Sequence, residues 1–129
     1  MMHLLLVAAG GALGAAARHL VNLAALRVVG PGFPAGTLLV NIAGSLLMGL
    51  LIGWLVARTA DAGSGQGLRL FLATGVLGGF TTFSAFSLDA VLLWERGAAA
   101  VALFYVALSV LGALAALGAG LWLARSLFA

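Results

Sequence analysis

The chain has 129 residues, of which 64% are hydrophobic and 7% are charged. A soluble domain is usually about 45–50% apolar and about 25% charged, so this composition indicates a membrane protein. The net charge is only +3 and the chain contains no cysteine. The composition therefore excludes disulfides and thiol catalysis, and the chain lacks the clustered basic patch that a nucleic-acid partner requires.

Four long hydrophobic segments follow one another along the chain, separated by connectors rich in glycine, proline or polar residues. A helix needs about 20 apolar residues to cross a bilayer, so four helices use most of the length and leave no room for a second domain. The first segment is interpreted as a span and not a signal peptide, because similar segments follow it. The sequence predicts a single all-α transmembrane domain over residues 1–129, with spans at about 3–26, 36–57, 68–94 and 98–124.

The arginines near the span ends are almost evenly divided between the two sides of the predicted bundle. An even number of spans places both termini on one side, with Arg58, Arg69 and Arg125, and leaves Arg27 and Arg96 on the other. The positive-inside rule gives such a chain little preference. Either other determinants fix one orientation or the chain inserts both ways. Small residues at spacing four allow close helix packing, within one chain or between two copies.

The third span contains the most informative segment, Gly78–Thr82, in which two glycines, a phenylalanine and two threonines follow one another. Glycine and threonine are poor helix formers, and the span at 68–94 is longer than a straight crossing needs. The segment predicts a helix that is broken near mid-membrane. Carbonyls freed by the break need partners in hydrocarbon, and a bound cation is one such partner. A simple glycine kink at a helix crossing is the alternative.

Several side chains near the break could bind an anion. Phe80, Phe83 and Phe86 recur at spacing three. Such a stripe usually packs against a neighbouring helix, but the positive edge of an aromatic ring also suits an anion. Asn41 is either a hydrogen-bonding link between helices or an amide donor to an anion. Arg18 either extends to the membrane surface or has a function inside the membrane.

Tyr105 and Ser109 place two hydroxyls on one face of the fourth span, where hydrogen bonding between helices is the ordinary role. The acidic residues form no mid-membrane pair, since Asp61 is in a loop, Glu95 ends a span and Asp89 lies toward the end of the third span. The two histidines have no companions at ligand spacing, so we expect no transition-metal site. No nucleophile and base stand in a catalytic pattern, so we expect no enzyme.

Three segments of the chain resemble segments of the CrcB/Fluc family of fluoride channels. They are G-G-A-L-G-A-A-A-R at 10–18, G-T-L-L-V-N-I-A-G at 36–44 and G-V-L-G-G-F-T-T-F-S-A-F-S at 75–87. The length and the four-span layout agree with the family along the whole chain. The resemblance implies an antiparallel, dual-topology homodimer in the inner (cytoplasmic) membrane, which passively exports fluoride through two pores and so relieves its toxicity.

The resemblance also implies roles for individual residues. A structural sodium ion at the dimer centre would be bound by the backbone carbonyls of Gly78 and Thr81 from both subunits. The family often has a third polar residue in its fourth span, and Ala113 stands at that position here. The residues expected along the fluoride pore are Asn41, Thr82, Phe83, Ser84, Phe86, Tyr105 and Ser109, with Arg18 toward the pore vestibule.

Two other functions are weighed against the channel. A proton-coupled small multidrug transporter is also short and four-spanning, but it needs a membrane-embedded glutamate in the first span, where this chain has Arg18. A structural subunit of a larger membrane complex would not conduct ions. The sequence therefore predicts a fluoride channel, with the transporter as the alternative.

Overall fold

The computed structural model describes residues 1–58 and 65–128, and Asp61 lies outside them. Within the described ranges, four helical segments are long and apolar enough to cross a membrane, which gives the all-α architecture of a multi-pass membrane protein. They are α1 (Met2–Val29), α2 (Ala35–Arg58), a composite segment (Gln66–Glu95) and α6 (Ala99–Phe128). Each predicted span lies within one of these segments, except that Ala98 precedes α6 by one residue.

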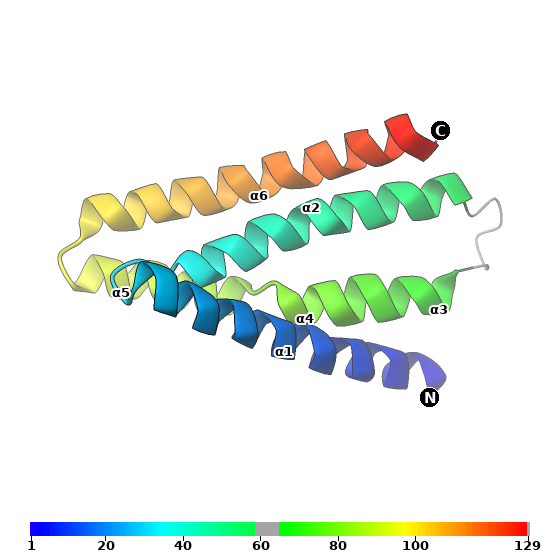
Figure 1. Cartoon of the computed structure of the whole chain (residues 1–129), viewed down its shortest axis with the longest axis horizontal. Coiled ribbons are helices and arrows are strands. Elements are labelled where there is room, and N and C mark those ends of the chain that lie inside the picture. The colour runs from blue at the N-terminus through cyan, green and yellow to red at the C-terminus, as the bar shows by residue number, and fades with distance from the viewer. Residues whose placement is uncertain (59–64, 129) are drawn as a thin grey trace.

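Both ends of the chain lie at one end of the bundle (Figure 1). The connector at 30–34 and the turn at 96–98 lie at the opposite end. This arrangement follows from the even number of crossings.

The third crossing is a composite of four helical pieces. A short helix α3 (Gln66–Arg69) leads into the π-helix η1 (Leu70–Leu77), then α4 (Gly78–Phe80), and after a break α5 (Phe83–Glu95). The break consists of Thr81 and Thr82, whose ψ angles of 158° and 120° are those of extended chain. The predicted break is therefore confirmed, but it is narrower than predicted.

The glycine pair that the sequence places in the break is helical. Gly78 has φ −64° and ψ −36°, which are ordinary helical values. A methyl group at Gly79 would overlap the Gly11 carbonyl oxygen of α1. Gly79 therefore packs closely against α1, and neither glycine ends the helix, so including the pair in the break was wrong.

Figure 1 shows α1 lying along η1 and α4, while α2 lies along α6. Glycine permits both close approaches. A methyl group at Gly14 would overlap the Val76 carbonyl oxygen, and one at Gly49 would overlap the Leu117 carbonyl oxygen. Helices in lipid associate through such backbone contact, since burial from water does not drive them together. At Gly14 and Gly49, small residues therefore pack helices within one chain.

The turn between α5 and α6 places the start of α6 beside α5. Gly97 has φ 79°, a left-handed conformation that ends helices and favours glycine, and the Ala98 amide donates to the Leu93 carbonyl at 3.1 Å. Beyond this turn a buried cluster forms between the two helices. Its members are Phe86, Leu93, Ala102 and Tyr105. The cluster lies on the α5 side of the break.

Candidate functional site

The backbone of Thr82 in the break is satisfied by one side chain from α2. The Thr82 amide donates to Asn41 Oδ1 at 2.8 Å, and Asn41 Nδ2 donates to the Thr82 carbonyl at 3.0 Å. These two bonds replace the helical bonds that the extended chain loses. An unsatisfied amide or carbonyl in hydrocarbon costs several kcal/mol, so Asn41 makes the break tolerable. The carboxamide has two N–H groups, and its bond to Thr82 uses one of them.

Hydroxyl groups stabilise the helix ends on both sides of the break. Thr82 Oγ1 accepts from the Ala85 amide at 3.2 Å and so caps the N-terminus of α5. Ser84 Oγ lies 3.3 Å from Thr82 Oγ1. On the other side, Thr81 Oγ1 donates to the Leu77 carbonyl at 3.0 Å. Both threonine hydroxyls are therefore structural, in addition to the expected roles of Thr82 in the pore and of the Thr81 carbonyl as a sodium ligand.

Carbonyls before and within the break lose the donors that a continuous helix would give them, and those of Gly78 and Thr81 are among them. The amide four residues beyond Gly78 is that of Thr82, which donates to Asn41. The amide four residues beyond Thr81 is that of Ala85, which donates to Thr82 Oγ1. Carbonyl oxygens released in this way are the ligands that a monovalent cation takes inside a membrane protein.

One cavity of about 350 Å³ lies beside the break, and we call it the pore cavity. Its lining includes Asn41, Thr82, Phe83, Phe86, Ser109 and Ala113. Ser109 is 4% exposed, and among the described atoms its hydroxyl has no hydrogen-bond partner. A buried hydroxyl without a partner is costly, so this group is available to a ligand or a water molecule. The pore cavity thus presents hydroxyl and amide donors next to aromatic rings.

The aromatic rings continue from the pore cavity toward the connector end of the bundle. The centroids of Phe83 and Phe86 are 5.4 Å apart, and those of Phe86 and Tyr105 are 5.5 Å apart. Phe33 meets the Tyr105 ring edge to face at 5.7 Å. The fully buried Tyr105 donates its hydroxyl proton to Asp89 Oδ2 at 3.3 Å. The contacts therefore connect the pore cavity to a carboxylate.

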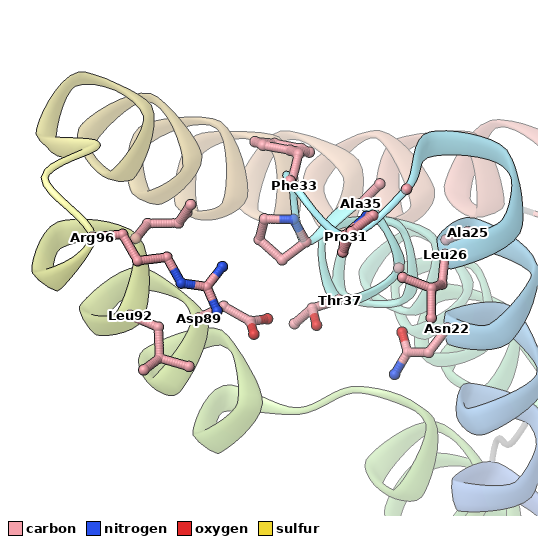
Figure 2. Close-up of a pocket in the computed structure, with 15 residues that line it drawn as sticks. Asn22, Ala25, Leu26, Pro31, Phe33, Ala35, Thr37, Asp89, Leu92 and Arg96 are labelled. Carbon is pink, nitrogen blue, oxygen red and sulfur yellow. The ribbon is translucent and has the colours of Figure 1, made fainter.

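A second cavity of about 300 Å³ lies at the connector end, and we call it the surface cavity. Figure 2 shows Thr37 of α2 and Asp89 of α5 turned toward each other there, with Asn22 of α1 on the opposite side from Arg96. Asp89 lines this cavity and Phe86 lines the pore cavity, while Tyr105 contacts both residues. Tyr105 therefore lies between the two cavities.

The structure brings most of the expected pore residues together. Asn41, Thr82, Phe83, Phe86 and Ser109 line one cavity, and Ala113 lines it as well. Tyr105 joins them through Phe86, and Ser84 joins them through Thr82. The arrangement is consistent with their expected roles and does not by itself assign them.

Arg18 is the exception among the expected pore residues. It is partly exposed on α1 and is not among the residues that line either of the two described cavities. The stripe of Phe80, Phe83 and Phe86 is also divided, because Phe80 belongs to α4 and packs against Gly44. Spacing three along the chain therefore did not place the three rings on one continuous helix.

The residues around the surface cavity were missed by the sequence reasoning. Asp89 was placed only toward the end of a span, although an ionisable residue within a membrane segment is a candidate functional residue on that ground alone. Asn22 and Thr37 belong to no sequence pattern that predicted a site. Asn22 Oδ1 is buried without a hydrogen-bond partner among the described atoms.

Comparison with known proteins gives one consistent result. Residues 5–121 match the family described as CrcB-like protein, Camphor Resistance (CrcB). A protein of Mesorhizobium japonicum named fluoride-specific ion channel FluC is 58% identical over 98% of this chain and 99% of its own length. Proteins of the same name from Agrobacterium fabrum and Paracoccus denitrificans are 56% and 60% identical, over 99% and 95% of this chain and 100% and 94% of their own lengths. The chain therefore belongs to the CrcB family.

Proposed function

We propose that this protein is a fluoride-selective channel that lets fluoride leave the cell passively and so limits its toxicity. The observation that carries the proposal is the pore cavity, where hydroxyl and amide donors lie beside two phenylalanine rings and an Asn41-supported break. The relatives are named fluoride-specific ion channels, over nearly the full length of both chains. The family is one of ion channels and not of enzymes.

The chemistry of the pore cavity suits fluoride. Fluoride is small and strongly hydrated, so a pore must replace its water with several hydrogen-bond donors. Asn41 Nδ2 and the Ser109 hydroxyl supply donors, and the edges of Phe83 and Phe86 carry positive partial charge. The residues lining this cavity include no cationic side chain. An anion is therefore held weakly enough to leave, as conduction requires.

The freed carbonyls of Gly78 and Thr81 fit a structural sodium ion. Both carbonyls have lost their helical donors, and neutral oxygens are suitable ligands for a monovalent cation. Such an ion would supply fixed positive charge close to the pore cavity without a charged side chain. The Gly78 and Thr81 carbonyls of a second copy would double the proposed set of ligands.

The exposure of one wall of the pore cavity in a single chain supports a homodimer. Phe83 lines the pore cavity yet is 78% exposed, and Ser84 beside it is exposed as well. A second copy placed against this face would complete the wall of the pore. Three arginines at one end and two at the other give no strong orientation, so an antiparallel pair inserted both ways in the inner membrane is the arrangement we propose.

Growth in fluoride tests the physiological role. Cells lacking their own fluoride export should grow in fluoride when they express this chain, and should tolerate less fluoride when they express Phe86→Ile at the same level. Tags on both termini should be accessible from both sides of the membrane. Unchanged sensitivity to fluoride in cells that express the chain would contradict the proposed export, and tags accessible from one side only would contradict dual topology.

A further inference from the structure

The surface cavity contains one carboxylate and one guanidinium. Of the residues that line it, Asp89 and Arg96 are the two with charged side chains. Figure 2 shows the Arg96 side chain turned back along α5, on the same side of the cavity as Asp89. Arg96 itself is exposed and follows the last residue of α5. The pair therefore stands where the cavity meets the end of the bundle.

Asp89 lies in an unfavourable place for an anion pathway. Its carboxylate accepts from the Tyr105 hydroxyl, and the Tyr105 ring contacts Phe86 in the pore cavity. If fluoride enters the pore cavity from the surface cavity, as the proposed function allows, it passes the negative charge of Asp89. Because like charges repel strongly in a partly desolvated site, an uncompensated Asp89 would slow this approach.

We infer that Arg96 compensates the charge of Asp89 and thereby sets the rate at which fluoride enters the pore from the surface cavity. This inference rests on the proposed function. Arg96 does not touch the ion in the pore cavity; it acts on the potential of the cavity in front of it. Clefts lined by charge change association rates by factors of about 10–1,000, and the effect falls steeply with ionic strength. Salt dependence is therefore the signature that distinguishes this role from a structural one.

Arg27 is the matched control for Arg96. It is an exposed arginine at the same end of the bundle, but it is not among the residues lining the surface cavity. Arg27→Gln and Arg96→Gln therefore remove the same charge from the same end of the protein. Only the second removes it from the cavity.

The test measures fluoride efflux from liposomes at sub-saturating fluoride, in about 0.01 M and about 1 M of an impermeant salt, where the screening lengths are about 30 Å and about 3 Å. At low salt, R96Q should reduce the initial rate by about three- to tenfold, while R27Q and R96K stay within about twofold of the unsubstituted protein. At high salt all four proteins should agree within about twofold. If R96Q does not purify as a monodisperse protein, R96A removes the same positive charge and takes its place in the test.

A second pair of variants tests the coupling to Asp89. D89N keeps an acceptor for the Tyr105 hydroxyl but removes the negative charge. At low salt, R96Q should therefore lower the fluoride efflux rate by a smaller factor in the D89N background than in the unsubstituted protein. An R96Q rate equal to that of R27Q at low salt would overturn the inference, and so would a loss that persists at high salt. If the unsubstituted protein carries no fluoride, the proposed function fails as well; if it does carry fluoride, these results overturn only the role of Arg96.

Discussion

Asn41 forms hydrogen bonds to both the amide and the carbonyl of Thr82, at 2.8 and 3.0 Å, across 41 positions of sequence. One side chain of α2 thus replaces both helical partners that the break removes from this residue. The bonds also fix the carboxamide at the wall of the pore cavity, with a remaining N–H available to an anion. Asn41 therefore supports the break, and in the proposed function the same side chain also binds the anion.

Replacing Asn41 with alanine should both destabilise the protein and stop conduction. The change leaves the Thr82 amide and carbonyl unpaired, which we expect to cost about 2–5 kcal/mol from the usual penalty for two unsatisfied buried groups. Unfolding in mixed detergent micelles measures the first effect, and fluoride efflux measures the second. Ser45→Ala is the control, since Ser45 lines the same cavity one turn further along α2. Equal stability of the two variants would show that Asn41 does not support the break.

Replacing Phe83 or Phe86 with isoleucine should reduce fluoride efflux while the protein stays folded. Each change removes a positive ring edge, and a lost contact of about 1.4 kcal/mol lowers a rate by about tenfold. Phe86 is 8% exposed and Phe83 is 78% exposed, so only Phe86→Ile should also lower stability. The matched control is Phe104→Ile, since Phe104 is exposed on α6 and is not among the residues lining the pore cavity. Unchanged efflux in both variants would mean that these rings only pack.

Adding a methyl group to α1 should destabilise the protein at Gly14 but have little effect at Gly11, three residues earlier. At Gly14 a methyl would overlap the Val76 carbonyl oxygen of η1, whereas at Gly11 it meets no atom within 4 Å in the described chain. Gly14→Ala should therefore destabilise the protein by about 1–3 kcal/mol, as overpacking usually does. Gly11→Ala should have little effect on unfolding in detergent. Equal effects of the two substitutions would contradict the close contact between α1 and η1.

Removing sodium should reduce fluoride efflux if the freed carbonyls bind this ion. Protein purified and reconstituted with N-methylglucamine in place of sodium should conduct less and recover when sodium is added. Thr81→Ala should keep the sodium dependence, because the proposed ligand is the backbone carbonyl and not the side chain. Full activity without sodium would rule out the proposed role for the ion.

The number and approximate positions of the helices could be predicted from the sequence, because the lengths of the apolar segments determine them. Four apolar segments predict four helices, and the extended Thr81 and Thr82 lie within the segment predicted to break. The extent of the break was not predictable, since Gly78 and Gly79 are poor helix formers on any propensity scale. Both residues are nevertheless helical, and Gly79 packs against α1, which is a tertiary effect. The π-helix η1 likewise has no signal in the local sequence.

The expected pore residues came from the family resemblance more than from the physics of single residues. Asn41 alone permitted two roles, and only its geometry shows that it supports the break. The contact of Tyr105 with Asp89 joins α6 to α5, and a pair of residues on different helices leaves no pattern in one sequence. Arg18 shows that a motif match does not fix a residue's position, because Arg18 lines neither of the two described cavities.

The most direct test of the account is efflux of fluoride and of chloride from the same liposomes, read by ion-selective electrodes with purified protein. The account predicts rapid loss of fluoride and retention of chloride, because the donors and ring edges of the pore cavity suit a small anion that can be stripped of water. Phe86→Ile liposomes should lose fluoride about tenfold more slowly and still retain chloride. Chloride efflux at a rate similar to that of fluoride, or no fluoride efflux above protein-free liposomes, would contradict the central claim.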